Sequence, residues 1–372
     1  MILHQDCRHF RSDIPCSFHK EEGVHCEDCP HYDPIAHKIL IVKLDAMGDV
    51  LRTTSILAAL KEKFPKTHIT WLTRAESIPL LLNNPFIDAM MDYSPESFLT
   101  IQSESYDLVL GLDASPASAK ATTVSNGKEK RGFGYDPRGF SYPLNQETRK
   151  WYEMGLFDDV KKRNQSTYQD IVFEACGLQS ANRGIIYRVA QQELTAAEIL
   201  RKKWRINGRM PVIGINPGAG RRWVNKKWPE SNVVSLIRML LKENYQVVLL
   251  GGEDETELNA RIRKKVKGKL IDSGFGHPVR EYAAIMNLCD LIVTMDTLSL
   301  HLALGLGKKV VALFGPTSAV EIEMYGQGLK IEPEVECRCY YRRSCTAEHH
   351  CMETISPGAV YSAVSAQLSD RS

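Results

Sequence analysis

The sequence predicts an α/β protein in which two domains, each built on parallel strands, follow one another along the chain. In both halves, short apolar runs alternate with segments of helical periodicity, which is the pattern of buried parallel strands connected by helices. The chain has 372 residues, of which 43% are hydrophobic and 25% are charged. This length and composition suffice for two globular domains with full cores.

The clearest strand–helix–strand unit lies in the last third of the chain. Two apolar runs, Leu291–Thr294 and Lys309–Phe314, have the composition of buried strands, and residues at helical spacing lie between them. Such a unit places its ligand site at the carboxyl end of the first strand. Asp296, Thr297 and His301 follow that strand, so we expect their side chains to face a cleft.

A similar unit opens the first domain. The run Lys38–Lys43 predicts a buried strand, and the residues from Val50 onward have helical spacing. Gly48 permits a tight turn between them, and Asp49 stands where the helix begins. Asp49 is therefore a candidate catalytic carboxylate, although capping of the helix explains the same position. Other expected features of this half are strands at residues 68–72 and 106–112, and irregular loops over a cleft at residues 113–150.

The second domain is predicted to begin near residue 205. After a strand at residues 211–216, the small residues 217–220 allow backbone N–H groups to approach a phosphate. The basic residues that follow either supply charge to such an anion or are simply solvated: Arg221, Arg222, Lys226 and Lys227. Glu253 follows the next strand, where it either accepts hydrogen bonds from a ribose or caps the helix after it. The basic face of that helix is either solvated or in contact with an anionic membrane surface.

Ten cysteines fall mostly into two clusters at the chain ends, where reduced thiols favour metal ligation. The first cluster has the pattern C-x8-C-x9-C-x2-C and consists of Cys7, Cys16, Cys26 and Cys29. It predicts a structural metal, for which zinc is favoured, an iron–sulfur cluster is the alternative, and free thiols or disulfides remain open. About 35 residues are too few for a core of their own and would need such a site.

The second cluster has shorter spacings, which allow either a second metal site or a single disulfide. Its members are Cys337, Cys339, Cys345 and Cys351, with His349 and His350 nearby. Cys176 and Cys289 are expected to be small buried apolar residues.

Charge and hydropathy narrow the classes of function. The net charge of +2 argues against general nucleic-acid binding. No apolar run approaches the roughly 20 residues of a membrane-spanning helix, and the N-terminus has cysteine, histidine and charge where a signal peptide has an apolar core. A cytoplasmic location is therefore expected.

Three ordered motifs resemble glycosyltransferase family 9, the ADP-heptose:lipopolysaccharide heptosyltransferases. Residues 38–64 resemble the family's opening strand and M-G-D-V-L-x-T start, and residues 216–229 resemble its donor loop with a basic pair and Trp-Pro. Residues 296–317 are similar to its D-T-x-x-x-H and F-G-P-T signature. The likeness extends over about residues 38–365.

The resemblance implies a GT-B architecture, in which two Rossmann-like domains face each other across a cleft. Four segments are then expected: a small Cys/His-rich metal-binding extension at 1–35, an acceptor domain at 36–205, a nucleotide-sugar domain at 206–335, and a Cys-rich tail at 336–372. The helix of the tail would cross back to the first domain.

The resemblance also implies an inverting transfer of heptose from ADP-heptose to a lipid-linked lipopolysaccharide core, by a protein at the inner face of the inner membrane. Asp49 matches the catalytic base, which takes the proton of the acceptor hydroxyl. Lys226, with Lys227 beside it, matches the lysine that binds the diphosphate. Asp296 would bind hydroxyl groups, Thr297 a phosphate oxygen, and His301 would shape the pocket. No catalytic metal is expected.

Two features depart from the family pattern. Leu298 stands where the family usually has glycine, which bears on the pose of the donor, and many relatives lack the first cysteine cluster, which bears on the acceptor. Two alternatives therefore stay open: the same fold acting on another nucleotide sugar, and a metal-stabilised binding or scaffold protein with a degenerate cleft. An NAD-dependent dehydrogenase fits less well, because its glycine fingerprint is missing after Val42.

Overall fold

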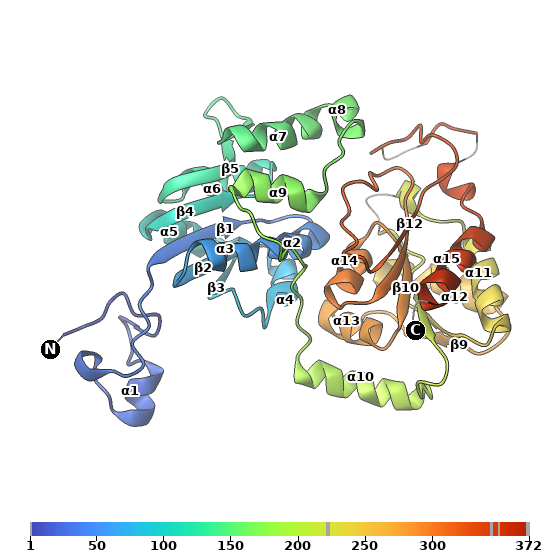
Figure 1. Cartoon of the computed structure of the whole chain (residues 1–372), viewed down its shortest axis with the longest axis horizontal. Helices are drawn as coiled ribbons and strands as arrows, with labels where there is room; N and C mark the ends of the chain where they lie inside the picture. Colours follow the sequence, from blue (N-terminus) through green and yellow to red (C-terminus); the bar gives the residue numbers. More distant parts are fainter. Residues whose placement is uncertain (1, 221–223, 343–344, 349, 370–372) are drawn as a thin grey trace.

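The computed structural model describes residues 2–220, 224–342, 345–348 and 350–369, which are arranged around two six-stranded sheets (Figure 1). In spatial order, the first sheet consists of β3 (Ala89–Asp92), β2 (Thr67–Thr73), β1 (His37–Val42), β4 (Tyr106–Gly111), β5 (Gly127–Tyr135) and β6 (Ser141–Pro143). The second consists of β12 (Gly328–Ile331), β11 (Lys309–Leu313), β10 (Leu291–Met295), β7 (Val212–Ile215), β8 (Gln246–Leu249) and β9 (Leu270–Asp272). The paired strands are parallel except β5 with β6. Two parallel-sheet α/β domains are therefore confirmed.

Helices connect the strands of each sheet. Those of the first half are α2 (Met47–Thr53), α3 (Leu57–Lys63), α4 (Ile78–Leu81), α5 (Pro95–Ser103), α6 (Pro116–Val124), α7 (Arg149–Leu156), α8 (Asp158–Lys162) and α9 (Tyr168–Cys176). Those of the second half are α10 (Gln191–Lys203), α11 (Glu230–Lys242), α12 (Thr256–Lys265), α13 (Val279–Asn287), α14 (Leu298–Gly305) and α15 (Pro357–Ser369). Within the described residues, no helix has both the length and the apolar composition needed to cross a bilayer.

The strand order determines where a ligand can bind. In the first sheet β1 lies between β2 and β4, and in the second β7 lies between β8 and β10. The chain therefore runs outward from each central strand on one side and then returns to continue on its other side. In open parallel sheets, ligand sites lie beyond the carboxyl ends of the strands at such a reversal. The segments that follow β1, β7 and β10 carry the predicted site residues other than Glu253, which follows β8.

The two domains pack against each other through α2 and α14. Leu51 on α2 belongs to the same buried apolar cluster as Leu300 on α14 and Phe314 after β11. These residues are at most 1% exposed, so apolar burial stabilises the boundary between the domains.

The expectation of irregular loops at residues 113–150 is wrong. This segment contains α6, β5, β6 and the start of α7, and β5 extends the first sheet by pairing in parallel with β4. The sequence did not indicate β5 because its first residues are mostly charged and because glycine, which is uncommon within strands, recurs in it. One of these glycines, Gly132, has a φ of +90°. A Cβ at Gly132 would lie 1.9 Å from the carbonyl oxygen of Gly111, so the close approach of β4 requires glycine there.

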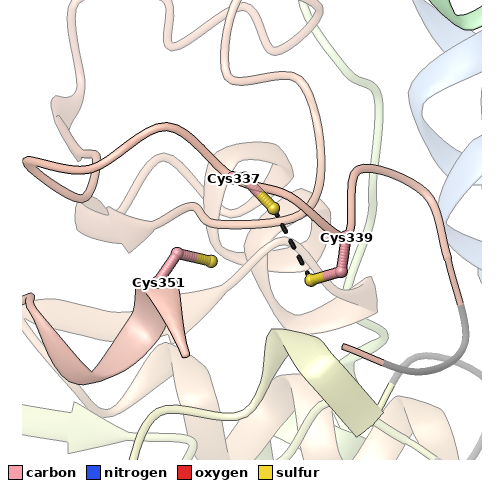
Figure 2. A group of neighbouring side chains, drawn as sticks. All are labelled: Cys337, Cys339 and Cys351. Atoms are coloured by element: carbon pink, nitrogen blue, oxygen red, sulfur yellow. Dashed lines mark hydrogen bonds between the residues drawn. The ribbon is translucent and has the colours of Figure 1, made fainter. Parts of the chain in front are cut away.

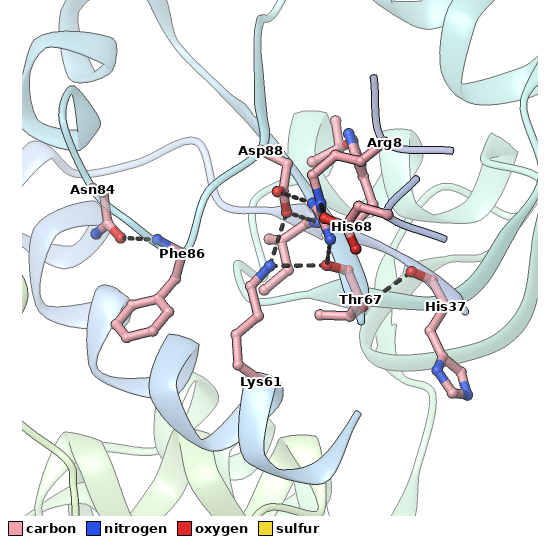
Figure 3. A network of polar contacts seen from close by, with 11 residues as sticks. Arg8, His37, Lys61, Thr67, His68, Asn84, Phe86 and Asp88 are labelled. Atoms are coloured by element: carbon pink, nitrogen blue, oxygen red, sulfur yellow. Dashed lines mark hydrogen bonds and ion pairs between the residues drawn. The ribbon is translucent and has the colours of Figure 1, made fainter. Parts of the chain in front are cut away.

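The N-terminal extension docks on the first sheet, on the side of that domain far from the second domain (Figure 1). It contains the short helix α1 (Ser17–Glu22), and Arg8 joins it to the domain (Figure 3). The Arg8 guanidinium donates to Asp33 at 2.9 Å, to the Thr67 carbonyl oxygen at 3.0 Å, and to the Asp88 carboxylate. Lys61 also donates to Asp88, at 3.0 Å. The extension is thus held by charge pairs at the amino-terminal end of β2.

The last helix was expected to cross back to the first domain, but it does not. Instead α15 packs against α11, β11 and β12 of the second domain (Figure 1). Val360 and Val364 on α15 are fully buried in the same apolar cluster as Leu236 and Ile237 on α11. The apolar face of α15 is therefore satisfied within the second domain.

Candidate active site

Asp49 lies in the first turn of α2, directly beyond the carboxyl end of β1. Its Oδ1 lies 2.8 Å from the Arg52 guanidinium, one turn later, and its Oδ2 accepts a hydrogen bond from the Ala46 backbone N–H at 3.4 Å. The side chain is 36% exposed. The carboxylate therefore contacts the start of its helix and also remains accessible to a substrate.

Sequence reasoning missed three groups around Asp49. Lys43 is 4% exposed, and its ammonium donates to the backbone carbonyl of Asp45. The Arg52 guanidinium lies 3.7 Å above the ring of Tyr168, on the distant helix α9. The sequence offered one signal, which was Lys43 directly after the apolar run of the predicted strand. It offered none for the contact of Arg52 with Tyr168, because that contact depends on the tertiary structure.

Local charges keep Asp49 ionised. Burial opposes its ionisation, but the positive charges of Arg52 and Lys43 outweigh burial and hold the pKa of Asp49 well below its ordinary value. An anionic carboxylate is the state that a proton acceptor requires.

Lys226 and Asp296 form a half-buried ion pair in the second domain. Lys226 closes the short helix η5 (Val224–Lys226) in the donor loop (residues 216–229), and its Nζ lies 2.7 Å from Asp296 Oδ2 and 2.9 Å from the Asp296 carbonyl oxygen. The side chains are 12% and 17% exposed. Burial opposes ionisation of Asp296, but Lys226 and other nearby positive charges lower its pKa. The adjacent strands β7 and β10 bring these residues together.

Hydrogen bonds hold the start of the donor loop against α14. Asn216 Nδ2 donates to Ser299 Oγ at 2.7 Å, and Asn216 Oδ1 accepts from the Gly218 backbone N–H at 3.2 Å. The Tyr282 hydroxyl lies 2.8 Å from the same Ser299 oxygen. A Cβ at Gly218 would lie 2.0 Å from Oε1 of Glu255. The small residue that the sequence marked here thus makes room for a carboxylate of its own domain.

His301 lies between the two halves of the site. It is 5% exposed on α14, and a Cβ at Gly48 of the first domain would lie 2.9 Å from its Cδ2. Burial, and then the charge of Arg52, lowers the pKa of His301 to about 4, so the ring is neutral at pH 7. The charges of Asp49 and Asp296 also act on this ring. The candidate base and the donor-side residues therefore face one domain boundary.

Two further predicted donor residues, Thr297 and Lys227, are half-buried. Thr297 is the half-buried N-cap residue of α14, with its Oγ1 3.2 Å from that of Thr294. Lys227 is half-buried beside Lys226. Arg221 and Arg222 lie outside the described residues.

Glu253 is exposed at the start of the short helix η6 (Glu253–Glu255). The carboxylate that is buried there belongs to Glu255, which is 9% exposed and accepts from the Gly252 backbone N–H at 3.0 Å. Sequence reasoning chose the first acidic residue after the strand, whereas the fold turns the third one inward.

A second buried carboxylate, Glu321, faces the same domain boundary. It is 8% exposed, its backbone carbonyl accepts from the Tyr168 N–H at 2.9 Å, and its Oε1 lies 3.8 Å from Lys161 Nζ. Burial raises the pKa of Glu321, in contrast to Asp49. The sequence offered no signal for it, because Glu321 lies in an irregular segment after the F-G-P-T motif.

The prediction of a cysteine cluster at the N-terminus is wrong. All four predicted ligands line one cavity of about 260 Å³: Cys7, Cys16, Cys26 and Cys29. Within the described residues, however, no three potential ligand atoms of this segment lie within 4.8 Å of one another, as a closed tetrahedral site needs. No residue between 2 and 35 is fully buried, so no core draws these sulfur atoms together.

The cysteine cluster is instead C-terminal (Figure 2). The sulfur atoms of Cys337 and Cys339 are 3.6 Å apart, and that of Cys351 belongs to the same group, within 4.8 Å of both. Cys345 and His350 form a second such group with Cys339. The cysteines are free, so the disulfide alternative is not realised, and these residues can hold a metal ion. His349 lies outside the described residues. Cys176 and Cys289 are 1% exposed, as expected.

Comparison with known proteins identifies the family. Residues 98–350 match the family model of glycosyltransferase family 9 (heptosyltransferase). Lipooligosaccharide heptosyltransferase 2 of Haemophilus influenzae is 24% identical over 297 residues, which cover 75% of this chain and 84% of the relative. Lipopolysaccharide heptosyltransferase 2 of Escherichia coli is 24% identical over 311 residues, covering 76% and 83%.

Solved structures share the fold. A family 9 glycosyltransferase from Veillonella parvula superposes with a TM-score of 0.72 at 18% identity, covering 90% of this chain and 98% of the other. E. coli ADP-heptose heptosyltransferase II gives 0.66 at 21% identity, covering 90% and 99%. The E. coli heptosyltransferase WaaC with ADP-2-deoxy-2-fluoro heptose gives 0.59 at 17% identity, covering 88% and 99%. The fold is thus that of the GT-B heptosyltransferases, and the chain belongs to glycosyltransferase family 9.

Proposed function

We propose that this glycosyltransferase moves a heptose from ADP-heptose onto a lipopolysaccharide core, with inversion at the anomeric carbon. The observation that carries the proposal is the meeting of Asp49 from the first domain with the Lys226–Asp296 pair of the second at one boundary, where both carboxylates act on His301. The family, and a relative of this fold that holds an ADP-heptose analogue, support the choice of donor.

Asp49 acts as the general base. The ionised carboxylate takes the proton of an acceptor hydroxyl while the hydroxyl oxygen forms a bond to the anomeric carbon. The bond from that carbon to the diphosphate breaks at the same time, and its electron pair passes to the phosphate oxygen. Attack opposite to the leaving group inverts the anomeric centre without a covalent enzyme intermediate.

The second domain binds the departing diphosphate. Lys226, which Asp296 holds in place, supplies positive charge, with Lys227 beside it, and the N-terminus of α14 supplies backbone N–H groups next to Thr297. Asp296 binds hydroxyl groups of the sugar or ribose. Neutral His301 shapes the pocket. In this proposal, these side chains balance the charge that a divalent metal balances in other transferases.

The proposal includes one further donor contact and an acceptor. Glu253, at the carboxyl end of β8, accepts hydrogen bonds from the ribose. The acceptor is a lipid-linked core oligosaccharide, so the enzyme works in the cytoplasm, in peripheral contact with the inner face of the inner membrane. Nucleic acid is not a partner.

A donor panel tests this proposal. The purified protein is incubated with ADP-heptose, GDP-sugars and UDP-sugars, and thermal stability is recorded, because a ligand that binds only the folded state raises the melting temperature. Transfer to a lipopolysaccharide core is then measured for each donor that binds. Asp49→Asn is the matched variant, which should bind the donor as the parent does and transfer about 100-fold to 10,000-fold more slowly.

Two results would contradict the assignment. Preference for a different nucleotide sugar would retain the mechanism but replace the donor. Absence of transfer from every donor, with any core acceptor, would favour a binding or scaffold protein instead.

A further inference from the structure

We propose that Cys337, Cys339, Cys345 and Cys351 bind one metal ion, and that this ion holds the donor loop where Lys226 can meet the donor diphosphate. The inference rests on the proposed function in one respect: it takes the diphosphate of ADP-heptose as the ligand of the donor loop. The ion would lie in the segment from residue 337 to residue 351, which we call the tail loop.

The sulfur positions of Cys337, Cys339 and Cys351 match three corners of a tetrahedral site, and Cys345 lies beside Cys339 as the candidate for the fourth. Four thiolates about 2.3 Å from a zinc ion lie about 3.8 Å from one another. The Cys337 and Cys339 sulfur atoms are 3.6 Å apart, and Cys351 and Cys345 each lie within 4.8 Å of Cys339 in their groups. Cys339 belongs to both groups, so it is the ligand that the two groups share. Tetrahedral sulfur sites hold zinc or iron.

His350 supports the site rather than completing it. The Met352 backbone N–H donates to His350 Nδ1 at 3.3 Å, so the neutral ring carries its proton on Nε2. That Nε2 lies 3.9 Å from the Cys339 sulfur and points its N–H at a thiolate. Hydrogen bonds of this kind orient and stabilise metal-bound sulfur.

The tail loop needs such a site because it has little regular structure of its own. Between β12 and the short helix η7 (Cys351–Glu353), the described residues form no helix or strand. A segment without a core or a backbone ladder gains its order from a metal when its ligands converge.

The tail loop contacts the donor loop directly. Asn225 Nδ2 donates to the Arg342 carbonyl oxygen at 3.1 Å, and the next residue is Lys226, which pairs with Asp296. One hydrogen bond thus joins the backbone between the metal ligands Cys339 and Cys345 to the residue that precedes the diphosphate-binding lysine.

The tail loop also contacts the F-G-P-T motif. The Tyr341 backbone N–H donates to the Pro316 carbonyl at 2.8 Å, and its hydroxyl accepts from the Ser318 N–H at 3.3 Å. A Cβ at Gly315 would lie 2.4 Å from Met352 Sδ and 3.2 Å from Cys351 Sγ. The motif therefore packs against a metal ligand without a gap.

The first domain touches the same loop. Lys161 Nζ lies 3.8 Å from the centre of the Tyr341 ring, and Lys162 pairs at 3.5 Å with Glu336, directly before the first cysteine. A metal in the tail loop would hold a segment that both domains contact. Its loss should weaken donor binding first, because the base Asp49 lies on α2 and does not depend on the tail loop.

Metal content tests the site. Cys337→Ser/Cys345→Ser should contain one equivalent of zinc or iron fewer than the parent by elemental analysis. Cys16→Ser/Cys29→Ser is the matched control at the other cysteine-rich end and should not show this loss. An unchanged metal content in the tail variant would overturn the site, as would loss of the same equivalent in the control alone.

ADP affinity tests the effect on the donor loop. Loss of one hydrogen bond predicts a Kd for ADP about three- to tenfold higher in the tail variant, with circular dichroism reporting whether the fold is kept. Asn225→Ala should weaken ADP binding similarly while retaining the metal. Treatment of the parent with a chelator should reproduce the loss, and added zinc or iron should reverse it.

The outcomes separate this inference from the proposed function. ADP affinity that is unchanged both in metal-free parent protein and in the tail variant would overturn the role of the ion in donor binding. A parent that binds no ADP at all would refute the donor, and the metal measurement would then still decide the site.

Discussion

The Arg52 guanidinium lies 2.8 Å from the Asp49 carboxylate and 3.7 Å above the ring of Tyr168. This geometry fixes the cation beside the candidate base, because the ring of Tyr168 comes from α9, which packs against α2. The pair explains how a carboxylate at a domain boundary stays ionised in spite of partial burial.

Replacing Arg52 should change the pH dependence of transfer. In Arg52→Met, the pKa of Asp49 rises because burial remains while its nearest positive charge is lost. The acidic limb of the pH profile of kcat/KM should therefore move to higher pH, with the largest loss of activity below pH 6. Arg52→Lys, which keeps the charge, is the control. Identical acidic limbs in Arg52→Met and the parent would show that Arg52 does not set the ionisation of the base.

Substitutions at Lys226 and Asp296 should compensate each other in their effect on protein stability but not in their effect on ADP binding. Lys226→Met leaves a carboxylate that is 17% exposed without its partner, which should destabilise the fold by about 3 kcal/mol in chemical denaturation. Adding Asp296→Asn should restore most of that stability, because the unpaired charge is gone. ADP affinity should stay low in the double variant, since the cation is missing. Lys227→Met is the matched control, and a larger loss of ADP binding there would assign the diphosphate to Lys227.

Gly48→Ala should separate the domains slightly. The added methyl carbon would lie 2.9 Å from His301 Cδ2, and the resulting overpacking predicts a loss of about 1–3 kcal/mol. Gly155→Ala, on α7, is the control, because no neighbouring atom lies within 4 Å of its added Cβ. Both changes gain helix propensity, so the difference between their free energies of unfolding isolates the contact with His301. Equal stability of the two variants would show that the domain boundary accommodates the added methyl group without loss of stability.

His301 should contribute to acid sensitivity. Burial and then Arg52 lower its folded pKa to about 4 from an ordinary value of about 6.5, so the unfolded chain binds more protons between these pH values. The stability contributed by neutral His301 is therefore full above pH 6.5 and falls as the pH drops toward 4. His301→Gln should flatten the pH dependence of the unfolding free energy in this window. An unchanged slope would mean that the ring is protonated in the folded protein.

Arg8 should hold the N-terminal extension on the first domain (Figure 3). Arg8→Ala removes the hydrogen bonds to Asp33, Asp88 and the Thr67 carbonyl, so limited proteolysis should release the extension faster. Arg11→Ala is the control, because the Arg11 side chain is 59% exposed and its ion pair with Asp13 is local. Equal cleavage rates in the two variants would assign the docking to other contacts.

Much of the fold was readable from the sequence because buried parallel strands are short apolar runs. The strands β1, β2, β4, β7, β10 and β11 lie within two residues of their predicted bounds. The segment after β4 was misjudged because β5 begins with charged residues whose pairing with β4 no local pattern encodes.

The sequence by itself determined which residue types follow the strands, and hence the positions of Asp49 after β1, Lys226 in the loop after β7, and Asp296 after β10. Only the tertiary structure decided which of them meet: it paired Lys226 with Asp296 across 70 residues, placed Arg52 over Tyr168, and gathered the C-terminal rather than the N-terminal sulfur atoms. Local periodicity reports which face of an element is buried, whereas contacts between distant segments depend on strand order and domain packing.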